Sequence, residues 1–226
     1  MSATALRYER KFVLPGRSPA TALAWIRRHP AAFREVYPGR RVNNLYYDTA
    51  ARRDYLDHVQ GAPERGKLRV RWYGPPTGRI AQPRLEHKFR RGLLGGKQGH
   101  PLPPWELNGR LPPEAARVGS APDLPPVLRR LLIERQPALL NGYQRRYFAS
   151  ADGRFRLTLD TDVRFATLTG ADQRIRPLGP PLPLVILELK YPPAAAPEAD
   201  RVTNAFPARL TRCSKYGLGL DRLAPW

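Results

Sequence analysis

Basic side chains recur at every second position of the segment KLRVRWY, residues 67–73. Successive side chains of a β-strand point to opposite faces, so Lys67, Arg69 and Arg71 would share one face of a strand and apolar residues the other. Ammonium and guanidinium groups aligned in this way donate charge-assisted hydrogen bonds to phosphate oxygens. The chemistry that this spacing favours is the binding of a run of phosphate groups.

Other strand-like segments repeat the alternation and add carboxylates to the polar face. The segment RLTLDTDVRF, residues 156–165, alternates most clearly, and we expect Asp160, Asp162 and Arg164 on the side opposite its leucines. Each such face could be solvated by itself, or the faces could together line a closed sheet. We favour the second reading, because the chain has helical segments to cover the apolar faces. The polar faces contribute Lys11, Lys67, Arg69, Arg71, Arg84, Lys88, Arg90, Arg145, Arg156 and Lys190, together with Glu9, Glu86, Asp160, Asp162 and Glu188.

The carboxylates on these faces point to a metal ion. Carboxylates such as Glu9 and Glu188 repel a bare polyanion, but they are suitable ligands for Mg²⁺ or Mn²⁺, which bind protein and phosphate oxygens together. Phosphoryl transfer needs positioning and charge neutralisation more than a protein nucleophile. A charged tunnel of this kind is therefore consistent with metal-dependent phosphoryl transfer.

About eight strands and a few helices must position these residues. Ser18 and Pro19 predict the start of a helix that runs to about residue 28. From residue 92 to about 140 the strand pattern stops, and we expect a glycine-rich loop at 92–99 followed by a proline-rich and helical insertion. We expect strands near residues 6–14, 42–48, 55–60, 67–73, 83–91, 141–149, 154–165 and 184–191. The prediction is one α+β domain over residues 1–226, a closed eight-stranded antiparallel β-barrel with helices packed outside.

The composition indicates a polyanionic partner. Lys and Arg number 39 against 19 Asp and Glu, which gives a formal net charge of +20 over 226 residues. Nucleic-acid binding normally uses an exposed basic helix or loop, so the alternation with carboxylates argues against a specific nucleic-acid partner. We hypothesise that surplus arginines outside the tunnel guide polyanions to its mouth, namely Arg27, Arg28, Arg40, Arg41, Arg52 and Arg53.

The single cysteine, Cys213, excludes an internal disulfide and a zinc site built from cysteines. The sequence has no apolar run of membrane-spanning length, and its N-terminal residues lack the apolar core of a signal peptide. We therefore expect a soluble cytoplasmic protein.

Several motifs resemble one family of phosphate-handling enzymes. Glu9-Arg10-Lys11 is similar to the Glu-x-Lys signature of triphosphate tunnel metalloenzymes, the CYTH-like superfamily. The segments LYYDT, GAPERGKLRVRWYG, LEHKFRRG, YQRRYF, RLTLDTDVRF, LELKY and RCSKYG resemble its VTC branch, the catalytic domain of polyphosphate polymerases, from Tyr8 to about Leu220. Arg7 stands where relatives with a fuller Glu-x-Glu-x-Lys signature have glutamate. Because those relatives are often hydrolases or cyclases, this departure favours the VTC branch.

The resemblance implies roles for individual residues, with ATP and inorganic polyphosphate as substrates and Mn²⁺ or Mg²⁺ as cofactor. The residues expected to carry the transfer are Lys11, Arg69, Arg71, Lys88, Arg145 and Lys190. Further phosphate contacts are expected from Lys67, Lys97, Arg156, Ser214 and Lys215. Glu188 would be the main metal ligand, helped by Glu9, and Asp160 would contact the metal or orient a basic neighbour. A separate membrane protein is a further partner that the family allows.

Three functions follow from these expectations. The first is a metal-dependent polyphosphate polymerase that transfers the γ-phosphate of ATP to a growing chain. The second is a hydrolase of tripolyphosphate or nucleoside triphosphates with the same fold, and the third is a non-catalytic module that binds polyphosphate or nucleic acid. We rank them in this order.

Overall fold

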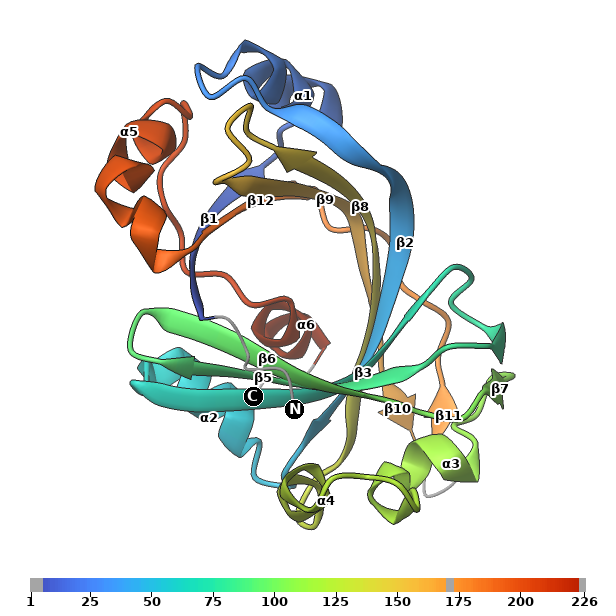
Figure 1. Cartoon of the computed structure of the whole chain (residues 1–226). Coiled ribbons are helices and arrows are strands. Elements are labelled where there is room, and N and C mark those ends of the chain that lie inside the picture. Colours follow the sequence, from blue (N-terminus) through green and yellow to red (C-terminus); the bar gives the residue numbers. More distant parts are fainter. Residues whose placement is uncertain (1–5, 170–172, 224–226) are drawn as a thin grey trace.

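The computed structural model describes residues 6–169 and 173–223, which form one large antiparallel sheet with helices outside it and one helix inside it (Figure 1). Going round the sheet, the strands follow the order β1, β12, β9, β8, β2, β3, β5 and β6, and β6 returns to β1 to close a barrel. The strand bounds are β1 (Arg7–Pro15), β2 (Arg34–Asp48), β3 (Glu64–Tyr73), β5 (Arg84–Arg91), β6 (Leu94–Pro101), β8 (Gln136–Ala149), β9 (Arg156–Ala166) and β12 (Leu184–Tyr191).

The barrel is less regular than the sequence led us to expect. Its closure rests on two residue pairs, Arg7 with Gly95 and Tyr8 with Leu94, and the pairing of β2 with β8 shifts register at three places. The expected α+β fold with an eight-stranded antiparallel sheet is nevertheless confirmed. The expectation that all helices pack outside was wrong for the C-terminal helix, residues 215–223, which packs against inner-face side chains.

Short helices and two small sheets accompany the barrel. The helices are α1 (Pro19–Arg28), α2 (Arg53–Gln60), α3 (Pro113–Ala116), α4 (Pro126–Leu132), α5 (Ala199–Asn204), α6 (Lys215–Leu223) and the 3₁₀ helices η1 (Val118–Ser120) and η2 (Pro193–Glu198). Helix α6 lies inside the barrel (Figure 1), where Tyr216 stacks on the inner-face residue Tyr46. The small sheets pair β4 (Gly78–Ile80) with β7 (Trp105–Leu107) and β10 (Leu168–Thr169) with β11 (Arg174–Ile175).

Helix α1 forms where its capping residues predict it. The hydroxyl of Ser18 accepts a hydrogen bond from the backbone N–H of Thr21 at 3.2 Å, and Pro19 occupies the first turn, where its missing N–H costs nothing. Its buried residues Ala22 and Ile26 face the barrel.

Two expected elements are different in the structure. Residues 55–60, expected as a strand, lie in helix α2, because the buried Asp48 carboxylate accepts the backbone N–H groups of Asp54 (3.0 Å) and Tyr55 (3.2 Å) and so satisfies the first helical turn. Residues 92–99, expected as a loop, mostly form β6. This strand pairs with β5 from Leu94 to Pro101, so its glycines are held by the ladder of hydrogen bonds despite their low strand propensity.

A bulge in β9 reverses the faces of its second half. Asp162 has a φ of 51°, and the register of β8 against β9 shifts between Gly142 and Gln144. As a result Val163 packs in an apolar cluster with inner-face side chains, and Asp162 leaves the inner face. The expectation that Asp162 and Arg164 share the face of Asp160 was therefore wrong. Asp162 instead accepts hydrogen bonds from Arg41 at 2.9 Å and Arg164 at 2.7 Å.

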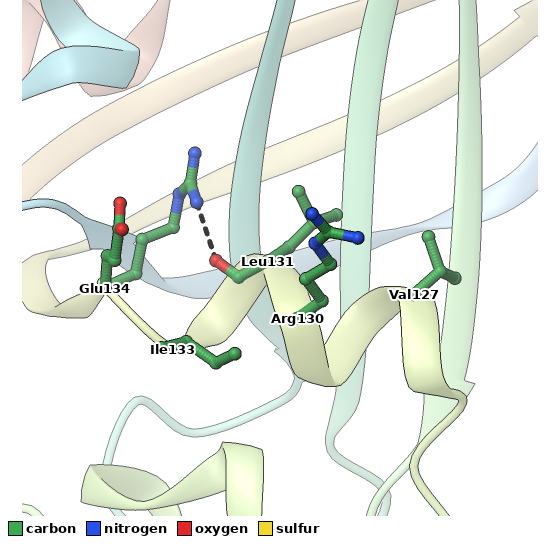
Figure 2. A pocket seen from close by; sticks show the side chains of 6 residues that line it. Val127, Arg130, Leu131, Ile133 and Glu134 are labelled. Atoms are coloured by element: carbon green, nitrogen blue, oxygen red, sulfur yellow. Dashed lines mark hydrogen bonds between the residues drawn. The ribbon is translucent and has the colours of Figure 1, made fainter.

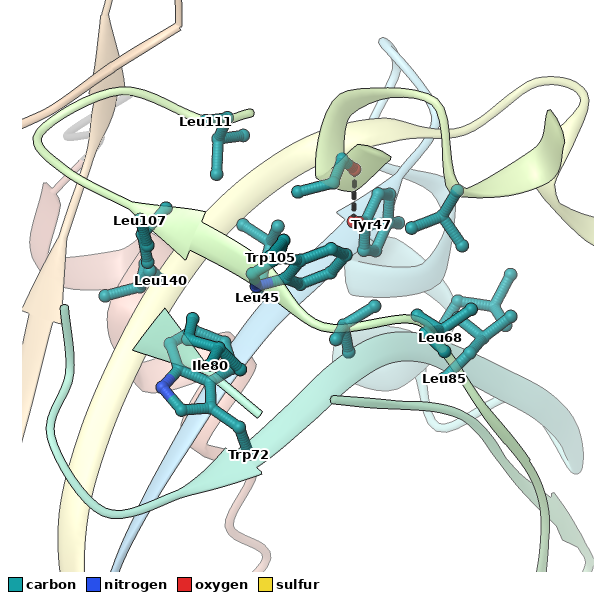
Figure 3. Packing of buried hydrophobic residues seen from close by; sticks show 14 of the residues in the cluster. Leu45, Tyr47, Leu68, Trp72, Ile80, Leu85, Trp105, Leu107, Leu111 and Leu140 are labelled. Atoms are coloured by element: carbon teal, nitrogen blue, oxygen red, sulfur yellow. Dashed lines mark hydrogen bonds between the residues drawn. The ribbon is translucent and has the colours of Figure 1, made fainter. Parts of the chain in front are cut away.

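Apolar side chains on the outer face of the sheet are covered by two layers. Over β2, β3 and β5, side chains such as Leu68 and Trp72 pack in one cluster with Trp105 of β7 (Figure 3). Leu128 of α4 belongs to the same cluster. Over β1, β9 and β12, a second cluster includes α1 and the region of α5, with Ile26 fully buried. Each large apolar side chain buried in this way contributes about 1.5–3 kcal/mol. Because the apolar faces are covered outside, the charged faces are left to the inside of the barrel.

Candidate active site inside the barrel

Cross-strand register brings the basic and acidic residues onto one inner face. Residues directly opposite each other on paired strands share a face, and the pairs run Arg69 with Glu86, Lys11 with Glu188, and Arg145 with Asp160. The sequence-predicted residues on this face are Lys11, Lys67, Arg69, Arg71, Lys88, Lys97, Arg145, Arg156, Lys190, Glu9, Asp160 and Glu188, with Ser214 and Lys215 reaching it from the start of α6.

A first cluster centres on the buried carboxylate of Glu86. Arg69 donates two hydrogen bonds to one carboxylate oxygen, at 3.0 and 2.7 Å, and Lys97 donates to the other at 3.1 Å. Arg71 lies 3.6 Å from the same carboxylate. Burial alone would raise the pKa of Glu86, but Arg69, Arg71 and Lys97 outweigh it and hold that pKa well below its usual value. The carboxylate is therefore ionised and keeps three cations aligned.

A second cluster centres on Asp160, which has no exposed surface. Arg145 donates to both of its oxygens, at 2.5 and 2.6 Å, and Lys215 of α6 donates to one of them at 2.5 Å. Burial alone would raise the pKa of Asp160, but the attraction of Arg145 and Lys215 outweighs burial and brings that pKa to about 2. Both oxygens are thus occupied by cations. This geometry suits the alternative that Asp160 orients basic neighbours.

Two more carboxylates form a third cluster, with lysines between them. Glu9 accepts a hydrogen bond from Lys88 at 2.6 Å, and Glu188 is paired with Lys11 at 3.3 Å and with Lys190. Burial and Glu188 raise the pKa of Glu9, yet the surrounding lysines bring it to about 2. Burial lowers the pKa of Lys88 to about 8, whereas the pKa of Lys11 rises to about 12 because Glu188 and Glu9 outweigh its burial.

The start of helix α6 supplies further polar groups. The Ser214 hydroxyl accepts a hydrogen bond from Lys67 at 2.5 Å and another from the backbone N–H of Gly217 at 3.3 Å, so it also caps the helix. Helix α6 is held in turn by Tyr216, whose hydroxyl donates to the buried Asp48 at 2.6 Å. The pKa of Lys67 is lowered by burial and by the neighbouring lysines.

The balance of charge on this face suits a polyanion. Nine basic side chains in these clusters face four carboxylates, so the cations are in excess by five: Lys11, Lys67, Arg69, Arg71, Lys88, Lys97, Arg145, Lys190 and Lys215 against Glu9, Glu86, Asp160 and Glu188. Solvent reaches several of them, since the side chains of Lys11, Lys88 and Lys97 are 22%, 28% and 50% exposed. In this partly desolvated setting, charge-assisted hydrogen bonds to phosphate oxygens are strong.

The carboxylates fit a divalent cation in part. In residues 6–169 and 173–223, no group of three or more His, Cys, Asp or Glu side chains is placed to hold a metal ion. Glu9 and Glu188 lie on adjacent strands and on the same face, and the charge of Glu188 raises the pKa of Glu9. Mg²⁺ is often bound through one or two carboxylates plus substrate phosphates, and these two side chains fit that donor set. Asp160 does not fit it, because Arg145 and Lys215 occupy its oxygens.

Two neutral polar residues of the inner face were not among the candidate site residues predicted from the sequence. Tyr143 is buried, accepts a hydrogen bond from Arg71 at 3.3 Å, and lies under the Lys215 ammonium at 4.6 Å from its ring centroid. The cations Arg145, Arg71 and Lys215 lower the pKa of its phenol to about 8 although burial opposes them. The buried Thr158 hydroxyl lies opposite Glu188 and has no hydrogen-bond partner among the residues that the structure describes. Alternation in β8 and β9 was the signal for both residues.

Other candidate features lie away from this face. A pocket of about 330 Å³ lies outside the barrel beside α4 (Figure 2), lined by Val127, Arg130, Leu131, Ile133, Glu134 and Arg135. It contains none of the inner-face residues. No helix in the described part of the chain is long and apolar enough to span a membrane.

The protein is thus an antiparallel β-barrel protein with ion pairs on the inner face of the barrel and apolar clusters on the outer face. The VTC domain family matches residues 6–224, and the chain belongs to this family. No curated protein sequence matches it.

Similar solved structures support the fold. A protein from Bacillus halodurans, provisionally assigned as an adenylate cyclase, is 14% identical with a TM-score of 0.51, and the match covers 98% of this chain and 99% of that chain. One from Vibrio parahaemolyticus with the same assignment is 12% identical with a TM-score of 0.50, covering 94% and 98%. A protein from Pyrococcus horikoshii OT3 is also 12% identical with a TM-score of 0.50, covering 95% and 99%. At these identities the likeness concerns the fold alone.

Proposed function

We propose that this chain is a metal-dependent phosphotransferase that extends inorganic polyphosphate with the γ-phosphate of ATP. The observation that carries the proposal is the excess of aligned cations on the inner face of a VTC-family barrel. Such an array suits a linear polyanion, because it offers many donors along the strands rather than one pocket for a single phosphate.

The reaction breaks the bond between the γ-phosphorus of ATP and its bridging oxygen, and ADP leaves. A terminal oxygen of the acceptor polyphosphate forms the new bond to that phosphorus. The barrel residues hold both anions in line and offset their mutual repulsion. Arg69 and Arg71 are fixed by Glu86, and Arg145 and Lys215 by Asp160, so these donors are oriented before substrate binds.

Glu9 and Glu188 would hold the divalent cation. When bound, Mg²⁺ or Mn²⁺ would neutralise charge on the phosphate oxygens and polarise the group being transferred. Lys88, Lys11 and Lys190, which pair with these carboxylates, would then turn their ammonium groups to phosphate oxygens.

The state of the carboxylates bears on which side chain could act as a base in hydrolysis. Hydrolysis is helped by a general base that takes a proton from water, and such a base works best with a pKa near the working pH. Each of the four inner carboxylates is paired with a cation, and the pKa values of Glu9 and Asp160 lie at about 2. These carboxylates are poor bases for water, whereas Lys88, with a pKa of about 8, is the inner-face side chain that could serve hydrolysis. The terminal oxygen of a polyphosphate is already anionic and needs no such base, so the product assay decides between the two reactions.

The test is to incubate the protein with ATP and Mn²⁺ and to resolve the products on a gel. We expect a ladder of long polyphosphate that is lost in Arg69→Ala and in Glu188→Ala. Free phosphate without a ladder would identify a hydrolase. Tight polyphosphate binding with neither product would identify a binding module.

A further inference from the structure

An arginine and three tyrosines form a cluster at one end of the inner face, which we call the mouth cluster: Tyr37, Arg40, Tyr73 and Tyr147. Arg40 stands opposite Arg145 in the pairing of β2 with β8, so it lies on the inner face. This corrects the expectation that Arg40 lies outside the tunnel. Tyr73 is the last residue of β3, so the cluster sits where strands end.

The cluster presents ring faces beside a planar cation. The Arg40 guanidinium lies 4.5 Å from the ring centroid of Tyr73 and 5.0 Å from that of Tyr147. The ring of Tyr37 meets Tyr147 edge to face at 6.1 Å. Tyr37 is 58% and Tyr73 45% exposed, so both side chains keep solvent-accessible surface. Exposed aromatic rings held in place by a guanidinium are suited to stacking on another planar group.

The next residues inward are phosphate-binding candidates. Arg145 lies opposite Arg40, and Arg71 lies two residues before Tyr73 on the same face of β3. A ligand that spans both groups needs a run of phosphates at one end and a planar aromatic ring at the other. Inorganic polyphosphate has no such ring, whereas a nucleoside triphosphate has both parts.

We propose that the mouth cluster binds the nucleobase of a nucleoside triphosphate by stacking, an inference that rests on the proposed function. The base lies against Tyr73, Tyr147 and Arg40. The triphosphate runs inward past Arg145 and Arg71, so the γ-phosphate points toward Lys215 and α6. Because stacking uses the face of the base rather than its hydrogen-bonding edge, adenine and guanine nucleotides should bind similarly.

The test compares two probes in the presence of Mg²⁺: adenosine 5′-(β,γ-imido)triphosphate and inorganic tripolyphosphate, both by isothermal titration calorimetry. We expect Tyr73→Leu to weaken the nucleotide about 5- to 150-fold, the range for loss of one base stack, and to change tripolyphosphate affinity less than about twofold. Tyr73→Phe, which keeps the ring, should leave both affinities unchanged. Arg40→Gln at its exposed position is a second variant, which should lower both affinities through the lost charge but should weaken the nucleotide more than tripolyphosphate.

Two results would overturn the nucleobase site. One is an equal loss of affinity for both probes in Tyr73→Leu and Arg40→Gln, and the other is unchanged nucleotide affinity in both variants. Wild-type protein that binds neither probe would overturn the proposed function as well. That result is distinct from wild-type binding of both probes with no selective loss, which overturns the nucleobase site alone.

Discussion

Replacement of Asp160 by asparagine tests the idea that carboxylates hold the inner cations in place. The side chain has no exposed surface and accepts three hydrogen bonds, two from Arg145 and one from Lys215, at 2.5 to 2.6 Å. Asparagine keeps the size but removes the charge, and so leaves two cations facing each other without their anion. The variant is therefore expected to lose stability.

The magnitude follows from the pKa and from the burial. A pKa of about 2 against the usual 3.8 corresponds to about 2.5 kcal/mol in favour of the folded state. Removal of one partner from a buried ion pair costs about 3–5 kcal/mol. We expect Asp160→Asn to lower the free energy of unfolding by about 2.5–5 kcal/mol, which for a chain of this size corresponds to about 5–20 °C in Tm.

The assay is urea or thermal unfolding at neutral pH, with Asp162→Asn as the matched control. Asp162 lies two residues away in the bulge, is partly exposed, and pairs with Arg41 and Arg164. Its loss should cost about 1 kcal/mol or less. Tripolyphosphate should stabilise Asp160→Asn more than wild type, because it supplies the missing negative charge. If Asp160→Asn were no less stable than Asp162→Asn, the role given to Asp160 would be wrong.

Three further results are expected. Arg145→Gln should lower the rate of polyphosphate synthesis about 10²–10³-fold, because it removes one donor that stabilises charge in the transition state. Arg146→Gln, on the outer face of the same strand, should change that rate less than about twofold. Comparable losses of rate in the two variants would contradict the assignment of Arg145 to the inner face and Arg146 to the outer face. Burial lowers the pKa of His87 to about 4. As the pH falls below about 6.5, the imidazole of His87 is therefore protonated in the unfolded chain while it stays neutral in the folded chain. This residue should account for about 2 kcal/mol of stability lost between pH 7.5 and pH 5, and His87→Gln should flatten the measured pH profile by that amount, with an unaltered profile as the contrary outcome. Tyr216→Phe removes a buried hydrogen bond to Asp48 and should cost about 1–3 kcal/mol in chemical unfolding while slowing synthesis, because α6 carries Lys215; full activity would show that this anchor does not position the helix.

Alternation alone predicted much of the inner face. In β3 and β5 the period of two is uninterrupted, so Lys67, Arg69 and Lys88 could be placed on one face from the sequence, and the register confirms that placement. The apolar residues between them, such as Leu68 and Val70, are buried under the outer layer as the pattern requires.

The differences arise where tertiary contacts override the local pattern. A bulge adds one residue to a strand without a sequence signal as clear as a glycine, so the turn of Asp162 away from the inner face could not be read from alternation. Strand β6 is rich in glycine and is stabilised by pairing with β5. Strand propensity describes single residues and does not include such pairing between segments. The sequence analysis assigned no strand to Arg40, because β2 begins at Arg34, before the apolar pattern that predicted a strand at residues 42–48.

Neutral side chains were harder still to predict. Tyr143 and Thr158 become candidates through the cations and carboxylates that surround them, and those neighbours come from other strands. A charged residue in an alternating strand stands out in the sequence, whereas a tyrosine or threonine there is an ordinary strand former.

The ratio of free phosphate to ADP released from ATP in the presence of Mn²⁺ tests the central claim most directly. Transfer to a polyphosphate chain gives ADP with little free phosphate, so the ratio should stay close to zero while the missing phosphate is recovered in long chains. A ratio close to one would mean that water is the acceptor, and the protein would then be a triphosphate hydrolase.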